Sequence, residues 1–240
     1  MNVWAISDLH LSFGRPDRRE RFGDRWRDHA AKIEASWRES VGRNDLVLVP
    51  GDVSSARNHR DLQPDLNWLE SLPGLKVLSP GNHDVWWNNL ARVRAMLRPS
   101  LRALEGDALV VGGVVVAGTR SASVPHRDDP DTPAARAGVA KSLDGLDAAL
   151  DAAAKVRECA EQPLIVLWHF PPFDAYGRAG PWVERFEAAG VTHCLYGHLH
   201  TQAQWSTAVQ GTRRGVRYQC VAADALGFRP IRVLEMRVAT

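Results

Sequence analysis

The chain has 240 residues, of which 45% are hydrophobic and 24% are charged. This ordinary globular mixture excludes wholesale disorder, a collagen-like repeat and a coiled-coil rod, and the length suits one substantial core better than two full domains. The formal net charge of +2 provides no broad basic field, so the composition disfavours a dedicated binder of duplex nucleic acid.

The first part of the chain alternates short apolar runs with helical patterns. Residues 3–6 predict a strand that ends at a polar Ser-Asp pair, and residues 46–49 and 75–78 predict two more buried strands. Apolar side chains recur at helical spacing between residues 26 and 41, and leucines do so between 62 and 69. The order strand, helix, strand, helix, strand favours a parallel sheet whose two faces are both covered.

The rest of the chain predicts a second sheet. Residues 121–137 have no apolar period and predict a loop, whereas residues 139–160 and 182–189 predict helices. Strand-like segments occupy residues 101–118, 164–168, 192–196, 218–222 and 231–236. We therefore predict an α/β fold, a four-layer helix–sheet–sheet–helix sandwich of mixed sheets. Residues 1–240 would form one domain, with a loop or lid over residues 120–138.

Cysteine usage and the apolar runs bear on location. Cys159, Cys194 and Cys220 are odd in number and widely spaced, which is typical of free thiols in a reducing compartment. No charged leader opens the chain, and its longest apolar stretches are far too short to span a bilayer. We predict a soluble, cytoplasmic protein without membrane association and leave its oligomeric state open.

Clusters of histidine and carboxylate residues follow the predicted strands, where open α/β sheets place their ligands. The clusters are Asp8-Leu9-His10, Gly51-Asp52, Gly81-Asn82-His83-Asp84, His169, and Gly197-His198-Leu199-His200. They contain more ligands than one metal ion needs, which indicates two divalent cations bridged by one carboxylate. Nitrogen and oxygen ligands without thiolate suit Mn, Fe, Zn, Co or Ni. The glycines would let the backbone turn sharply and keep the metals uncrowded.

In this order the clusters resemble the calcineurin-like metallophosphoesterase superfamily, and within it a bacterial branch of predicted phosphohydrolases. The family pattern is Asp-x-His, Gly-Asp, Gly-Asn-His-Asp/Glu, an isolated His and Gly-His-x-His, and all five blocks occur here between residues 8 and 200. The resemblance implies a phosphoesterase that hydrolyses a phosphodiester or phosphomonoester with hydroxide activated by two metal ions. The implied partner is a small phosphorylated substrate.

The resemblance also implies roles for individual residues. The implied metal ligands are Asp8, His10 and His200 for the first ion, Asp52 as the bridge, and Asn82, His169 and His198 for the second. His83 would face the scissile phosphate, where it stabilises charge or protonates the leaving group. Asp84 would orient His83. Pro80 departs from the pattern, because relatives often carry a basic residue before this glycine.

Residues outside the motifs are candidates for substrate contacts. Arg120, after a predicted strand, and Arg178, in the loop after His169, are candidates for bidentate phosphate binding. His126 is a further candidate in the predicted loop. Trp86 and Trp87 follow the Gly-Asn-His-Asp block, and we expect them to pack in the core rather than stack on a base.

The other histidines and the arginine-rich stretch have ordinary interpretations. We expect His29 and His59 on the surface and His193 packed within a strand. Residues 15–27 carry acidic as well as basic side chains, which predicts a solvated, ion-paired face.

Two other functions stay open at this point. A nuclease acting on small oligonucleotides would use the same chemistry, but the near-neutral charge and the lack of an evident nucleic-acid-binding region disfavour it. Some relatives on this fold, such as a retromer subunit, have lost catalysis and serve as protein-binding scaffolds. Such a loss usually shows as missing ligands, whereas every block is intact here.

Overall fold

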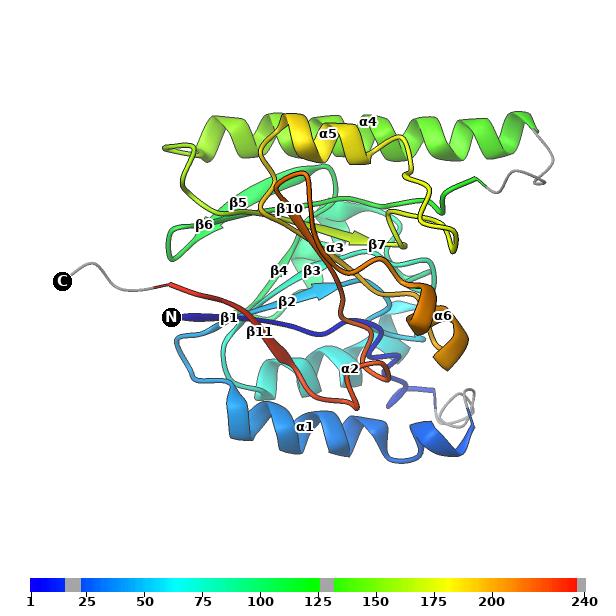
Figure 1. Ribbon diagram of the computed structural model, residues 1–240. Coiled ribbons are helices and arrows are strands. Elements are labelled where there is room, and N and C mark those ends of the chain that lie inside the picture. The colour runs from blue at the N-terminus through cyan, green and yellow to red at the C-terminus, as the bar shows by residue number, and fades with distance from the viewer. Residues whose placement is uncertain (16–22, 126–131, 237–240) are drawn as a thin grey trace.

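The computed structural model describes residues 1–15, 23–125 and 132–236. Two β-sheets pack face to face, and helices cover the outer face of each sheet (Figure 1). This arrangement confirms the predicted helix–sheet–sheet–helix sandwich.

The first sheet has the strand order β11-β1-β2-β3-β4. Its strands are β1 (Asn2–Ala5), β2 (Leu46–Pro50), β3 (Leu75–Ser79), β4 (Leu101–Ala103) and β11 (Ile231–Glu235). Strands β1 to β4 are parallel, and β11 pairs antiparallel with β1. Its helices are α1 (His29–Ser40), α2 (His59–Ser71) and α3 (Leu90–Met96), with a short 3₁₀ helix at Asp24–Trp26.

The second sheet has the order β5-β6-β7-β8-β10-β9. Its strands are β5 (Asp107–Val111), β6 (Val114–Gly118), β7 (Leu164–His169), β8 (His193–Tyr196), β9 (Gly211–Arg213) and β10 (Val216–Cys220). Strands β6, β7, β8 and β10 are parallel, and antiparallel β5 and β9 form the two edges. The accompanying helices are α4 (Pro133–Val156), α5 (Val183–Ala188) and α6 (Gln202–Thr207).

Three apolar layers hold these elements together. One lies between the first sheet and α1 and α2, and another lies between the second sheet and α4 and α5, as the arrangement in Figure 1 shows. The middle layer joins the sheets, with fully buried Leu48 and Val77 on one side and Val116, Ile165 and Leu195 on the other. Each such side chain contributes about 1.5–3 kcal/mol when it leaves water. Because the sheets are packed on each other, the carboxyl ends of strands from both meet at one edge of the sandwich.

The predicted loop over residues 121–137 is too long, because α4 begins at Pro133 and ends at Val156. The side chain of Thr132 accepts a hydrogen bond from the backbone N–H of Ala135, at 3.1 Å, and caps the helix. A proline in the first turn costs nothing, because its missing N–H would have no partner there. Residues 133–138 of the predicted lid are therefore helical, and residues 126–131 lie outside the described residues. Within the described ranges, no helix combines the length and hydropathy needed to cross a bilayer.

Candidate active site

Loops at the carboxyl ends of strands from both sheets bring the seven predicted metal ligands together. From the first sheet, Asp8 and His10 follow β1, Asp52 follows β2 and Asn82 follows β3. From the second sheet, His169 ends β7, and the loop after β8 carries His198 and His200. Parallel strands present their carboxyl ends on one side, which is why residues so far apart in sequence share one site.

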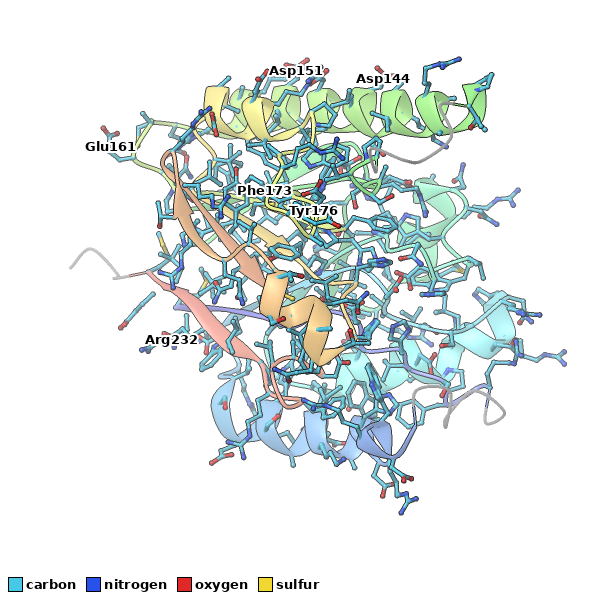
Figure 2. The ribbon with its side chains drawn as sticks, turned by 45° about the vertical axis from the view of Figure 1, so that its right-hand side comes forward. Asp144, Asp151, Glu161, Phe173, Tyr176 and Arg232 are labelled. Carbon is cyan, nitrogen blue, oxygen red and sulfur yellow. The ribbon has the colours of Figure 1, made fainter. Side chains whose placement is uncertain are left out.

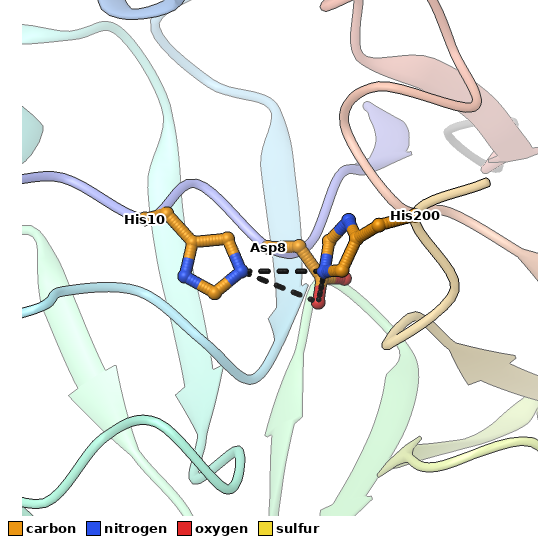
Figure 3. Close-up of side chains that lie close together, drawn as sticks. All are labelled: Asp8, His10 and His200. Carbon is orange, nitrogen blue, oxygen red and sulfur yellow. Dashed lines mark hydrogen bonds and ion pairs between the residues drawn. The ribbon is translucent and has the colours of Figure 1, made fainter. Parts of the chain in front are cut away.

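Asp8, His10 and His200 form the first group, and Figure 3 shows their side chains converging. Nε2 of His200 lies 3.4 Å from Oδ1 of Asp8 and 3.3 Å from Nε2 of His10. Asp8 is fully buried and His10 is 3% exposed. Two imidazole nitrogens and a carboxylate oxygen at these separations suit a divalent transition-metal ion.

The second group contains Asp8, Asp52 and His169, and Asn82 and His198 adjoin it. The amide oxygen of Asn82 lies 2.8 Å from Nε2 of His169 and 3.0 Å from Nδ1 of His198. Within the described chain, Oδ2 of fully buried Asp52 has no hydrogen-bond donor. It lies 3.7 Å from Nε2 of His10 and 3.6 Å from Nε2 of His169. A buried carboxylate oxygen left without a donor is costly, so its place between the groups fits a ligand shared by two cations.

The ring nitrogens that face away from the site are held by the protein. Nδ1 of His169 donates to the carbonyl of Pro50 at 3.0 Å, and Nδ1 of His200 lies 3.2 Å from both carboxylate oxygens of Asp224. These contacts turn both Nε2 atoms toward the cluster, as is usual for metal-binding histidines. Sequence reasoning missed Asp224. Its only signal was a carboxylate placed just after the predicted strand at 218–222.

Burial and neighbouring charges set the protonation of the metal-free site. Burial raises the pKa of Asp52 to about 7, lowers the pKa of His198 to about 4 and takes the pKa of His10 well below its usual range. Burial alone would lower the pKa of His200, but hydrogen bonds with Asp224 and Asp8 raise it to about 10. His10 and His198 are therefore neutral near pH 7, as ligation requires, whereas His200 must release a proton when a metal binds.

The backbone of the ligand residues is unusual. Asp8, His10, Asp52, His169 and His198 have φ of 56°, 42°, 52°, 61° and 69°, in the left-handed region that non-glycine residues rarely adopt. Each such residue costs on the order of 1–3 kcal/mol, and this kind of strain clusters at functional sites.

Two of the motif glycines are required by close approach. A Cβ at Gly81 would collide with the carboxylate of Asp52, and a Cβ at Gly197 would collide with the carboxylate of Asp8. Only glycine leaves these two carboxylates in place. This agrees with the expectation from the sequence that the glycines leave room around the metal ions.

His83 and Asp84 occupy the loop after β3. The backbone N–H of His83 donates to Oδ1 of Asp52 at 2.7 Å, and its half-buried ring lies 5.5 Å from the ring of His10. Asp84 is buried and accepts hydrogen bonds from the backbone N–H groups of Gly81 and Ser54, at 2.9 and 3.1 Å. It also accepts one from Nε1 of Trp86 at 3.0 Å. Asp84 thus fixes the backbone that carries His83.

The two candidate arginines use their donors within the protein. Arg120 donates to Glu105, to the carbonyl of Gly81 and to the carbonyl of Trp87, at 3.2, 3.2 and 2.8 Å. Arg178 pairs with Asp174 at 2.9 Å and donates to the carbonyl of Pro125. Arg120 therefore braces the loop that carries His83, and phosphate binding by either residue stays a prediction.

Other expectations have mixed outcomes. Trp86 and Trp87 are buried in the layer beneath the first sheet, as predicted. The prediction that His29 lies on the surface is wrong: it is 7% exposed, and its ring nitrogens lie 3.0 Å from the carbonyls of Trp26 and Leu9. His29 begins α1 beside the loop after β1, a contact that helical spacing does not reveal. His59 is exposed and His193 is part-buried, while His126 and residues 16–22 lie outside the described residues.

Comparisons with known proteins show a family and a fold. The family model described as calcineurin-like phosphoesterase matches residues 1–202, which include all seven predicted ligands. The Gene 66 proteins of Mycobacterium phages D29 and L5 are 39% and 35% identical over 84 and 83 residues. Each alignment covers 35% of this chain and only 40% of the phage protein. The crystal structure of phosphopantetheinyl hydrolase from Mycobacterium tuberculosis has a TM-score of 0.53 at 17% identity, over 92% of this chain and 88% of that one, which shows a shared fold.

Proposed function

Since the chain belongs to the calcineurin-like phosphoesterase family, we propose that it is a phosphohydrolase with two divalent cations that hydrolyses a small phosphodiester or phosphomonoester. The observation that carries this proposal is the place of Asp52, whose unpartnered buried Oδ2 lies 3.6–3.7 Å from an imidazole nitrogen of each ligand group.

The residues present fit such cations. Asp8, His10 and His200 would hold one ion, Asn82, His169 and His198 would hold the other, and Asp52 would contact both. The donors are nitrogen and oxygen, which suits Mn, Fe, Zn, Co or Ni. When bound, the cations would neutralise phosphoryl oxygens and lower the pKa of a coordinated water toward about 7.

The chain's own residues supply positioning and a proton. The half-buried His83 ring lies beside the first ligand group and is accessible to a substrate, so it would stabilise the departing oxygen or protonate it. Its backbone is held by Asp52, and Asp84 and Arg120 hold the loop around it. His83 therefore needs no rearrangement before it meets the leaving group.

The alternatives have less support. A non-catalytic scaffold has no reason to keep seven converging ligands, five of them on strained backbone. A nuclease would use the same centre, but the net charge of +2 offers little attraction for a polynucleotide. We extend the proposal to a cytoplasmic protein with one domain, and the free thiols of Cys159, Cys194 and Cys220 agree with a reducing compartment.

The test loads metal-depleted protein with one divalent metal at a time. Hydrolysis of bis(p-nitrophenyl) phosphate, p-nitrophenyl phosphate, cyclic nucleotides and nucleotide pyrophosphates is then measured beside metal content. We expect metal-dependent turnover in at least one class at two ions per chain, and its loss in His83→Ala without loss of metal. If the protein with two metal ions bound hydrolysed none of these substrates, the proposed phosphohydrolase activity would be refuted. If metal binding saturated at one ion per chain, the proposed two-metal centre would be refuted.

A further inference from the structure

A cavity of about 420 Å³ lies between the end of β6 and the first half of α4. Thr119 lines it from the strand end, and Gly138, Ser142 and Gly145 line it from the helix. The three helix positions are four and three residues apart, so they share one face of α4. A Cβ at Gly138 would meet nothing within 4 Å, whereas one at Gly145 would collide with Oγ1 of Thr119. Small residues on this face therefore keep the space open.

The cavity adjoins the candidate metal ligands. Its lining includes Arg120 and Phe170. The Phe170 ring centroid is 4.3 Å from that of His198, and Arg120 donates to the carbonyl of Gly81, the residue before Asn82. The cavity thus shares a wall with the second ligand group, and a phosphate held by the cations would place its organic substituent within reach of it.

Hydroxyl groups of two largely buried residues line the cavity. Thr119 is 2% exposed and Ser142 is 5% exposed. Across the part of the chain that the structure describes, neither hydroxyl makes a hydrogen bond. Ser121 also lines the cavity, and its Oγ accepts from the backbone N–H of Phe170 at 3.1 Å, so its own hydrogen is available to donate. These hydroxyl groups can each donate to or accept from a polar ligand in the cavity.

The charged residues of the described wall leave a positive excess. Arg120 is paired with Glu105, which also lines the cavity. Lys141 on α4 completes the wall, and no carboxylate of the described residues lies within 4.0 Å of its ammonium group. Among the described lining residues, Phe170 is the single aromatic, and its ring packs against His198. The described part of the wall thus offers the exposed ammonium group of Lys141 and several hydroxyl groups, but no pair of aromatic faces to hold a nucleobase.

We infer that this cavity is a subsite for the organic group of the substrate, and that it takes a short aliphatic group carrying hydroxyls and one anionic charge such as a carboxylate. The inference rests on the proposed phosphoesterase function, since the cations would anchor the phosphate next to the cavity. Its volume lies within the range of small-molecule sites.

The test measures binding by calorimetry to the metal-loaded protein, so it does not depend on turnover. The probes are 3-phosphoglycerate, glycerol 3-phosphate and propyl phosphate, which share a phosphate and a three-carbon chain. We expect 3-phosphoglycerate to bind about tenfold more tightly than propyl phosphate, as one charge-assisted contact predicts. Lys141→Gln should bring that ratio close to one. Glycerol 3-phosphate should bind somewhat more tightly than propyl phosphate, and Ser142→Ala should remove most of that difference. Alanine favours the helix, so a weakened α4 would not explain the loss.

The matched control is Lys155→Gln, an exposed lysine at the far end of α4 that does not line the cavity. It should keep the wild-type ratio. Equal affinities of the wild-type protein for the three probes would overturn the subsite. A ratio that survives Lys141→Gln would also overturn it, because the carboxylate would then be binding the metal ions. A failure of the proposed function appears separately, as metal-loaded protein that binds the probes but hydrolyses no phosphoester.

Discussion

The carboxylate of Asp224 holds Nδ1 of His200, with each oxygen 3.2 Å from the ring nitrogen. The contact joins the loop after β10 to the loop after β8, and the carbonyl of Asp224 also accepts from Arg25 at 2.7 Å. A residue outside the family-matched segment thus sets the tautomer of a predicted metal ligand.

Asp224→Asn should weaken metal binding without removing a ligand. The amide keeps the shape but loses the charge that orients the imidazole, so we expect metal affinity to fall 10–100-fold. Competition with a fluorescent chelator measures this. Asp144→Asn is the control, because Asp144 lies exposed on α4 (Figure 2). Unchanged affinity in Asp224→Asn would show that the contact does not tune the ligand.

Asp52→Asn should change stability in opposite directions with and without metal. Burial raises the pKa of Asp52 to about 7, above its value in the unfolded chain. In the metal-free protein the folded state then binds the extra proton, so stability is lost as the pH rises from about 4 through 7. The asparagine variant escapes this loss and should be the more stable protein at pH 8 in chelator. With metal present, wild type should be the more stable.

Urea unfolding at pH 5 and pH 8, with metal and with chelator, measures both effects of Asp52→Asn. If the same protein, wild type or Asp52→Asn, were the more stable at pH 8 both with metal and with chelator, Asp52 would not be a shared metal ligand.

Arg120→Lys separates a bracing role from phosphate binding. Lysine cannot satisfy three acceptors in the fixed geometry of a guanidinium, so the loop carrying His83 should shift. We expect kcat to fall about tenfold or more while KM changes little, because a small misplacement of a catalytic group is costly. Arg102→Lys is the control, because Arg102 is an exposed arginine that donates hydrogen bonds to the carbonyls of Pro99 and Leu101. A rise in KM at constant kcat would instead favour the phosphate contact predicted from the sequence.

Lys76→Met should flatten the alkaline rise in stability. Lys76 is fully buried, donates to Ser100 Oγ at 2.9 Å and to the carbonyl of Leu72, and burial lowers its pKa to about 8. The unfolded chain therefore binds more protons than the folded one between pH 8 and 10.5, so stability rises with pH across that window, by about 3 kcal/mol. Urea unfolding at pH 7.5 and 10 tests this, with Lys155→Met as control. Parallel profiles for wild type and Lys76→Met would refute the prediction.

The order of strands and helices along the chain, and the polar clusters at the strand ends, were predictable because they follow from strong local signals, whereas the assignment of ligands followed from the family resemblance. Buried parallel strands read as continuous apolar runs, and their carboxyl ends must lie on one side, so the sequence predicts that Asp8, Asp52 and His169 lie close together. The β5–β6 hairpin was similarly marked by Gly112 and Gly113, both of which adopt positive φ.

The features that sequence reasoning missed depend on tertiary contacts. The first turns of α4, residues 133–138, are exposed to solvent, so they show no apolar stripe. His29 is buried because a loop from elsewhere in the chain covers it, and Asp224 acts through a partner 24 residues away. Short elements such as α3, α6 and β9 span less than two helical turns or only three residues, too little for a period to register.

The distance along the chain between the ligands has a consequence for how the protein is made. Asp8 accepts a hydrogen bond from the backbone of His198, 190 residues later, and β1 completes its pairing only with β11. A ribosome must therefore release the chain through His200 before the first ligand group can assemble. A nascent chain that holds Asp8 and His10 without His200 has an incomplete first group, so capture of a metal ion there would report that the loop after β8 has been made and has folded onto the first sheet.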